Sequence, residues 1–197
     1  MPAATYVPKI EYKNIVVTGD THSNTTVDDI ASTTGIEVGM VCEASGVPVG
    51  TTVTVVAANS VTLSASATTS LNNTSLEFYH LVTFDYPPME DFGEQYDAKE
   101  RRSVSISGLT QVSIDHTEIV RIQKHRFITP TLLTTITTFF NNHGKLGESF
   151  RFYESKEVDT YVTYELAKYE LKAKRLLYKA SVSGFLHDLE LSFRRVL

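Results

Sequence analysis

Residues 30–68 read IASTTGIEVGMVCEASGVPVGTTVTVVAANSVTLSASAT, and this stretch determines the kind of fold that the chain predicts. It contains two runs rich in β-branched residues, at 53–56 and 61–64, with an Asn-Ser pair at 59–60 between them. Such residues favour β-strands, whereas Gly, Pro, Asn and Ser mark the turns that join strands. A Gly-Val-Pro sequence at 46–48 supplies a further turn. The stretch therefore predicts short strands joined by tight turns.

The same chemistry extends to both sides, from Ile15 to His80. These 66 residues contain 21 Ser or Thr and six acids but no Lys or Arg, and all 18 basic residues lie elsewhere. The formal charge is therefore −6 in this segment and +1 in the rest of the chain. We interpret residues 15–80 as a small Ser/Thr-rich all-β module of four to six short strands. It is inserted into a host domain formed by residues 1–14 and 81–197.

The host domain is expected to consist mainly of strands. Before the module, one strand ends at Ile10–Tyr12, a second covers Ile15–Thr18, and Gly19-Asp20 marks a turn. After the module, the host resumes at Thr83–Pro88, where two prolines end a strand because proline lacks the N–H that a sheet requires.

The remainder of the host alternates polar and apolar residues, as half-buried strands do. We expect a loop at Met89–Asp97 and a charged turn at Glu154–Asp159. Strands are expected at 101–106, 111–127, 150–153, 161–166 and 186–196. Residues 169–178 fit either a strand or a helix, and we favour a strand because the segment lies between clear strands. The apolar positions of the long segment 111–127 are Ile114, Ile119, Ile122 and Phe127.

One helix is predicted, at 130–143. Thr129 can cap its N-terminus and Pro130 suits the first helical position. A stripe with the 3.6-residue helical period follows, formed by Leu132, Leu133, Ile136, Phe139 and Phe140. We expect Leu133, Ile136 and Phe140 to be buried against the sheet. Gly144 can end the helix in the left-handed conformation.

Composition limits the class of protein. With 197 residues, 42% hydrophobic and 21% charged, the chain is typical of a globular protein with one or two domains. Its net charge of −5 argues against general nucleic-acid binding. Cys42 is the one cysteine, so no intrachain disulfide forms. There is neither an apolar run long enough for a membrane span nor a signal-peptide pattern, which predicts assembly in a cytoplasm.

Several groups of residues carry side chains that can form chemical sites. Asp115–His116 and His187–Asp188 could each be a catalytic Asp–His pair. Both pairs are sequence neighbours, however, and a strand directs neighbouring side chains to opposite faces, which favours surface pairs. Gly144-Lys-Leu-Gly147 follows a helix, whereas a phosphate-binding loop precedes one. The acids near residue 20 offer oxygen ligands for calcium, but in no calcium-binding spacing (Asp20, Thr21, His22, Asp28 and Asp29).

Two further groups have a structural and a functional interpretation. The first is a group of basic residues interspersed with acids (Lys168, Lys172, Lys174 and Arg175, with Glu165 and Glu170). We interpret this group as a solvated strand face of alternating charge, and the alternative is a nucleic-acid-binding surface. The aromatic residues around the helix are expected in the core and not in a ligand platform (Phe139, Phe140, Phe150, Phe152, Tyr153 and Phe193). The sequence therefore predicts no catalytic, cofactor-binding or metal-binding residues.

Residues 83–197 resemble a bacteriophage tail protein of the distal-tail, or baseplate-hub, kind. The similarity rests on the order of four segments: TFDYPP at 83–88, RRSVSISGLTQVS at 101–113, TPTLLTTITTFFNNHGKLGESFRFY at 129–153 and FLHDLELSFRRVL at 185–197. Residues 15–80 resemble a small β module that recurs in phage structural proteins. The resemblance implies a β-sandwich or split-barrel domain with one flanking helix.

The same resemblance implies a function without catalysis. Distal-tail proteins form rings, commonly six-fold, so we expect a virion structural protein assembled with other tail proteins such as tube, hub or fibre subunits. The sheet edges, the 89–97 loop and the 154–159 turn are expected to form the ring contacts, with the module facing outward. The alternatives are a glycan- or receptor-binding module of an adhesion device and, with least support, a hydrolase acting on cell wall or polysaccharide.

Overall fold

The computed structural model describes residues 6–108, 110–168, 170–179 and 185–196 of the 197-residue chain. The fold is mainly β with one α-helix in the described part, which confirms the predicted class. The chain divides into two compact units, one formed by residues up to Ile10 together with Val82–Leu197 and the other by Glu11–Leu81. The sequence pattern had placed these boundaries at residues 15 and 80. We call Glu11–Leu81 the inserted unit and the rest the host unit.

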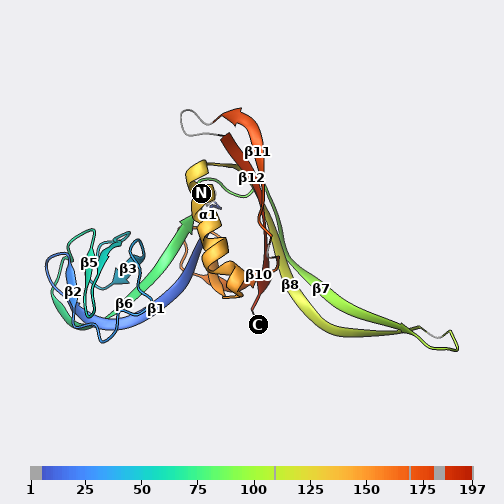
Figure 1. The fold of residues 1–197 in the computed structure, drawn as a ribbon, viewed down its shortest axis with the longest axis horizontal. Coiled ribbons are helices and arrows are strands. Elements are labelled where there is room, and N and C mark those ends of the chain that lie inside the picture. Colours follow the sequence, from blue (N-terminus) through green and yellow to red (C-terminus); the bar gives the residue numbers. More distant parts are fainter. Residues whose placement is uncertain (1–5, 109, 169, 180–184, 197) are drawn as a thin grey trace. The chain divides into compact units, whose positions relative to one another are not determined.

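The inserted unit is built from six antiparallel strands that enclose their own core. They are β1 (Lys9–Thr21), β2 (Thr26–Asp28), β3 (Val41–Ala44), β4 (Val53–Val56), β5 (Val61–Leu63) and β6 (Leu71–Thr83), and β1 and β6 continue into the host unit (Figure 1). The order β4-β5-β2-β1-β6-β3 places the first and last strands side by side. The core is formed by fully buried side chains such as Ile30, Met40, Leu76 and Phe78.

The predicted turn at Gly19-Asp20 is wrong, because both residues lie within the single long strand β1. The expected separate strands 10–12 and 15–18 are joined through Lys13, which has a positive φ of 57°. Gly19 is needed for close packing between strands and not for a turn. A Cβ atom at that position would lie 2.9 Å from the Asp28 carbonyl oxygen and 2.9 Å from Ile30 Cγ1, so only glycine fits between the strands.

The two connections to the inserted unit leave the host unit next to each other. The Phe84 N–H donates a hydrogen bond to the Pro8 carbonyl at 3.3 Å, and both residues belong to the host unit. The Lys156 N–H donates to the Val7 carbonyl at 2.8 Å and fixes the first of these segments. An insertion into a surface turn requires such neighbouring ends.

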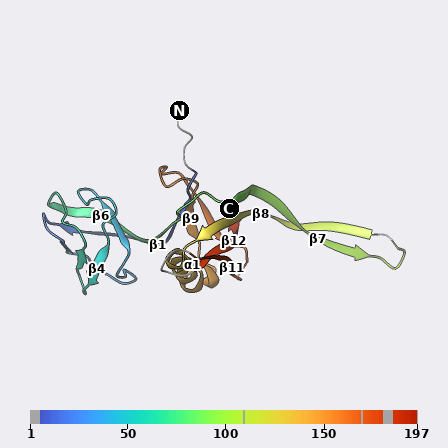
Figure 2. The same ribbon diagram turned by 90° about the horizontal axis from the view of Figure 1, so that it is seen from above.

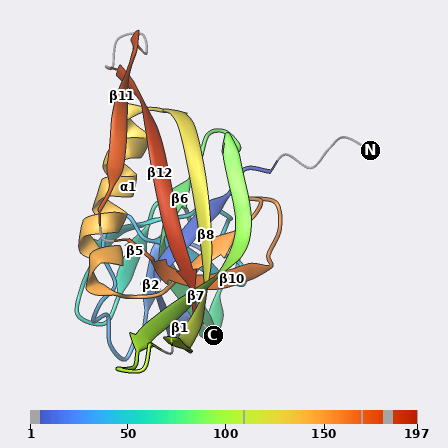
Figure 3. The ribbon, with the colours of Figure 1, turned by 90° about the vertical axis from the view of Figure 1, so that its right-hand side faces the viewer.

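The host unit is an antiparallel sheet in the order β9-β10-β12-β8-β7, with β11 also paired to β12. Its strands are β7 (Glu90–Val104), β8 (Thr110–Ile128), β9 (Phe150–Tyr153), β10 (Tyr161–Leu166), β11 (Lys172–Lys179) and β12 (Phe185–Arg195). Figure 3 shows β11, β12 and β8 side by side, as their pairing requires. The strands expected after the helix are confirmed within the described residues.

The helix α1 (Pro130–Asn142) packs on the sheet through aromatic contacts and begins as predicted. The Leu132 N–H donates to Thr129 Oγ1 at 3.3 Å, which caps the N-terminus. Phe139 meets Phe150 edge to face at a centroid distance of 5.1 Å, and Phe150 meets Phe193 at 5.2 Å. The aromatic residues predicted for the core are all buried.

Two details of the helix prediction are wrong. Leu133 is only half-buried, and the buried stripe consists of Leu132, Ile136, Phe139 and Phe140. Gly144 does not end the helix in the left-handed conformation, because it begins a 3-10 turn, η1 (Gly144–Leu146), and Gly147 adopts the positive φ of 75°. Gly144 is required by close packing, since a Cβ there would lie 2.3 Å from Leu166 Cδ1.

The predicted loop at Met89–Asp97 is also wrong, because β7 begins at Glu90 and pairs with β8 along its whole length, from Glu90↔Lys124 to Val104↔Thr110. β8 pairs with β12 only from Val120 to Ile128. Among the described residues, the outer part of β7 and β8 is therefore a two-stranded ribbon that no third strand supports. Figures 1 and 2 both show this ribbon narrowing to its tip, and we call its described part, residues 95–108 and 110–118, the arm.

Candidate functional site

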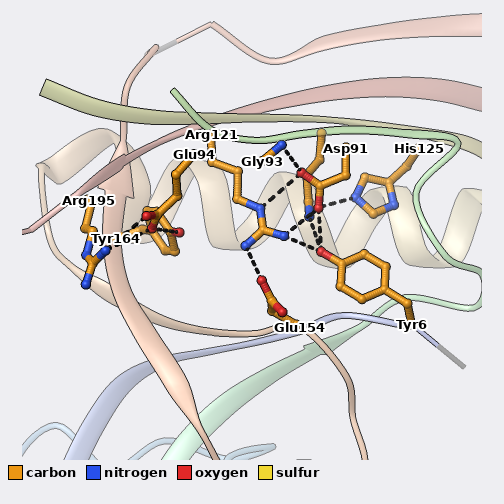
Figure 4. A network of polar contacts seen from close by, with 10 residues as sticks. Tyr6, Asp91, Gly93, Glu94, Arg121, His125, Glu154, Tyr164 and Arg195 are labelled. Atoms are coloured by element: carbon orange, nitrogen blue, oxygen red, sulfur yellow. Dashed lines mark hydrogen bonds and ion pairs between the residues drawn. The ribbon is translucent and has the colours of Figure 1, made fainter. Parts of the chain in front are cut away.

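The most elaborate polar arrangement of the host unit surrounds Arg121, whose side chain is buried (Figure 4). Its Nε donates to Asp91 Oδ1 at 3.2 Å and its Nη2 to Asp91 Oδ2 at 2.5 Å, which forms a two-pronged ion pair between β8 and β7. Its Nη1 donates to Glu154 Oε1 at 2.8 Å, on the turn after β9. The guanidinium carbon also lies 4.9 Å from the ring centre of Phe152.

Asp91 is the acceptor on which most of these donors converge. Its carboxylate receives hydrogen bonds from the Tyr6 hydroxyl at 2.5 Å, Gln123 Nε2 at 2.9 Å and the Gly93 N–H at 2.9 Å, in addition to those from Arg121. Burial alone would raise the pKa of Asp91, but the hydrogen bonds from Arg121, Tyr6, Gln123 and Gly93 together hold it well below its usual range.

The pKa values of two partners of Asp91, Tyr6 and Arg121, are shifted upward. Burial and the hydrogen bond to Asp91 raise the pKa of the Tyr6 hydroxyl, which keeps it protonated. The pKa of Arg121 is also raised, because the carboxylates of Asp91 and Glu154 outweigh the effect of its burial. Both residues therefore keep the donors that Asp91 needs over the whole range in which the protein is folded.

His125 extends the arrangement into the apolar core. Its Nε2 lies 3.3 Å from Gln123 Oε1, and its ring stacks on Phe84 at a centroid distance of 4.1 Å. Burial lowers the pKa of His125 to about 4, against a smaller opposite effect of the Asp91 charge. The imidazole is therefore neutral near pH 7.

A second group continues along the same strands. The Tyr164 hydroxyl donates to Glu94 Oε1 at 2.7 Å, and Arg195 Nη1 donates to Glu94 Oε2 at 3.0 Å. Burial and the hydrogen bond to Glu94 raise the pKa of Tyr164 to about 12. The two groups together connect β7, β8, β10 and β12.

The geometry of this polar network fits a structural role. Arg121 and Asp91 both use several polar atoms on neighbouring protein groups, and both contact the hydroxyl of the half-buried Tyr6. The network joins segments that are far apart in the sequence, from Tyr6 to Glu154. A buried ion pair of this kind contributes mainly by fixing which segments meet.

The host unit also contains a pocket of about 360 Å³ on the sheet face formed by β7, β8, β11 and β12. Two ion pairs line it, Lys124 with Glu90 at 2.6 Å and Arg126 with Asp188 at 3.5 Å. The exposed side chain of Met89 adds apolar surface. Asp188 Oδ1 is buried and makes no hydrogen bond, and its charge is paired with that of Arg126.

The residues considered from the sequence do not assemble into a chemical site. His187 and Asp188 are consecutive residues of β12, and the side chains of Asp115 and His116 lie outside the described part. Near residue 20, His22 Nε2 contacts Asp28 Oδ1 at 2.8 Å, while Asp20 accepts from the Asn73 N–H. No three His, Cys, Asp or Glu side chains among the described residues are grouped as metal ligands would be.

The basic set lies on β11 and the segment before it. Lys168, Lys172, Lys174 and Arg175 are exposed, and Arg175 lies 4.7 Å from the ring centre of Phe185. The pairings Lys172↔Glu190 and Lys174↔Asp188 place an acid opposite each of two lysines. This pattern is that of a mixed-charge solvated face. Cys42 is buried, and burial raises the pKa of its thiol to about 12.

Comparisons of the chain with known protein families, with curated proteins and with solved structures found no match. No helix among the described residues has the length and apolar character that crossing a membrane requires.

Proposed function

We propose that the chain is a virion structural protein, a subunit of an oligomeric ring in a bacteriophage tail, at the distal-tail or baseplate-hub position. The proposal assigns it no catalytic step. Its partners are further copies of itself, in a ring of six, and neighbouring tail proteins such as tube, hub or fibre subunits. It would be assembled in the host cytoplasm and remain in the virion.

The arm is the observation that carries this proposal. A two-stranded ribbon is only marginally stable in water unless a third strand or another layer supports it. No third strand pairs with the described residues of the arm. Neighbouring subunits of an assembly would provide such support. The order of strand and helix segments in residues 83–197, which resembles distal-tail proteins, points to a tail ring as that assembly.

The character of the two units supports a scaffold that presents a module. The inserted unit has its own core and neighbouring connections to the host unit. Its segment 15–80 has no Lys or Arg and a formal charge of −6. Net charge of this size keeps a surface solvated and discourages non-specific association, which suits an outward position.

The experiment is a mass measurement of the purified protein by light scattering over a wide concentration range, with negative-stain images of the same sample. A ring subunit gives a closed oligomer of fixed mass and ring-shaped particles. Mass spectrometry of purified virions should also detect the chain. A protein that stays monomeric at high concentration and is absent from virions would contradict the proposal.

A further inference from the structure

We infer that the tip of the arm is an assembly contact, and that it docks into the pocket beside Met89 on the host unit of a second copy. This inference rests on the proposed ring, and it names the surfaces that would join one subunit to the next. The two surfaces are different patches of the same chain. Their contact is therefore heterologous, which is the type that closes into rings.

The first surface is the apolar tip of the arm. Ile106 is fully exposed at the turn, and Val104 at the end of β7 is 68% exposed. The turn is compact, because the Gly108 N–H donates to the Ser105 carbonyl at 2.9 Å and the Ser105 and Ser107 hydroxyls lie 2.8 Å apart. Ile106 and Val104 therefore present apolar surface to solvent at the tip of the arm.

The β7 edge of the arm is poorly suited to binding by strand addition. β7 has eight charged residues among its fifteen, and its pairing with β8 shifts register between Asp91 and Glu94 and again between Lys99 and Glu100. Charges and bulges on an outer strand are features that prevent edge-to-edge pairing. Docking through the apolar tip is therefore favoured over docking through the edge.

The second surface is the pocket described above. The ion pairs Lys124–Glu90 and Arg126–Asp188 neutralise charges at the pocket, and Met89 supplies apolar surface, so an apolar side chain does not leave an unpaired charge behind. The turn at Ser105–Gly108 offers Ile106 as such an apolar side chain.

A second copy is the occupant that the observations favour. An exposed apolar group that complements a pocket elsewhere on the same surface leads to head-to-tail association of identical chains. Both partners of the contact are on this chain and both belong to the host unit. A contact with a different tail protein at either surface is an outcome that the experiments below distinguish.

The test uses two variants of the full chain, Ile106→Cys and Met89→Cys, each of which adds one cysteine to the buried Cys42. A disulfide forms only when the two Cβ atoms come within about 3.5–4.5 Å. Mixing the two variants under mild oxidation should give a covalent dimer of one chain of each kind, whereas each variant alone should give little. The wild-type chain is the control, since its only cysteine, Cys42, is buried.

A second measurement follows the strength of the oligomer. Ile106→Glu should raise its dissociation constant by about ten-fold or more, as expected when a buried apolar anchor of an interface is lost. Val49→Glu is the matched control, because Val49 is an equally exposed apolar residue in a turn of the inserted unit. An oligomer that forms without the mixed disulfide and tolerates Ile106→Glu would overturn this contact while leaving the ring intact. A strictly monomeric chain would overturn both.

Discussion

Arg121 donates four hydrogen bonds in the network of Figure 4, and its position explains how separate chain segments are joined in the host unit. It contacts Asp91 from β7 and Glu154 from the turn after β9, and it also donates to the Tyr6 hydroxyl near the N-terminus. Loss of one partner would leave a charge buried and unpaired. That cost exceeds the net contribution of the intact pair.

Arg121→Met should therefore destabilise the protein by about 3–5 kcal/mol, because the Asp91 carboxylate loses its counter-ion inside the structure. Urea denaturation followed by circular dichroism measures this change. Arg194→Met is the matched control on β12, since Arg194 is partly exposed and its pairs with Glu165 and Glu118 should contribute only about 0–1 kcal/mol. Equal losses in the two variants would contradict the structural role of Arg121.

His125 should make stability depend on pH between about 4 and 6.5. In the folded protein its pKa is about 4, so the imidazole stays neutral while the unfolded chain takes up a proton below pH 6.5. The unfolded state binds more protons in this window, so stability falls as pH is lowered. At pH 5 the expected loss relative to pH 7 is at most about 2 kcal/mol, at 1.36 kcal/mol per pKa unit.

The variant His125→Phe isolates this contribution. It should lose much less stability than the wild type between pH 7 and pH 5, whatever its stability at pH 7. Comparing one variant at two pH values separates the ionisation from any change in packing against Phe84. An unchanged pH dependence would show that His125 is not the group responsible.

The network could not be predicted from the periodicity of the sequence. In β8 the side chains at Ile119, Arg121, Gln123 and His125 alternate toward the interior, so three of these four buried positions carry polar groups. Of the apolar positions named for this segment, Ile119 is buried, Ile122 is half-buried and Phe127 is exposed with a positive φ of 61°, while the side chain of Ile114 lies outside the described part. The available signal was the regular spacing of three hydrogen-bonding residues on one strand face.

At the scale of single elements, the helix was the most predictable part. Thr129, Pro130 and the apolar stripe act locally, and local capping and periodicity determine where a helix begins and which face is buried. The role of Gly144 depends on Leu166, a residue of a different strand, and no local rule contains that contact. The first part of β7 was missed for the same reason, since its charged sequence becomes a strand by pairing with β8. The strand expected at 101–106 overlaps the end of β7.

Phe140→Ala tests the helix contact. Phe140 is 4% exposed, and removing a buried phenyl ring should cost about 3–5 kcal/mol. Leu133→Ala on the same helix is the control, because Leu133 is half-buried and should cost less. Thermal denaturation of both variants gives the comparison. Wild-type stability of Phe140→Ala would count against the packing of α1 on the sheet.

At the scale of the whole molecule, the division into a host unit and an inserted unit follows from charge and composition. The loss of Lys and Arg between Ile15 and His80 located the segment within a few residues of the unit Glu11–Leu81. The boundary itself could not be read from composition, because β1 and β6 run through it without a break.

Replacing residues 11–81 by a short Gly linker between Ile10 and Val82 should leave a folded host unit. The Phe84–Pro8 hydrogen bond holds the two ends together, so the linker has little distance to span. Cooperative thermal unfolding of the shortened chain is the expected result. Arg121→Met in this background should destabilise it as it does the full chain, and an unfolded product would mean that the host unit depends on the insertion.

The position of β12 in the sheet has a consequence for synthesis on the ribosome. β12 lies between β8 and β10, although it follows the other described strands in the chain. A nascent chain can complete all pairings of the inserted unit once Leu81 has emerged, and domains commonly fold in this N-terminal-first manner. The edges of β8 and β10 stay open until translation reaches Arg195. Chains stalled before Phe185 should therefore carry a protease-resistant inserted unit beside a protease-sensitive host.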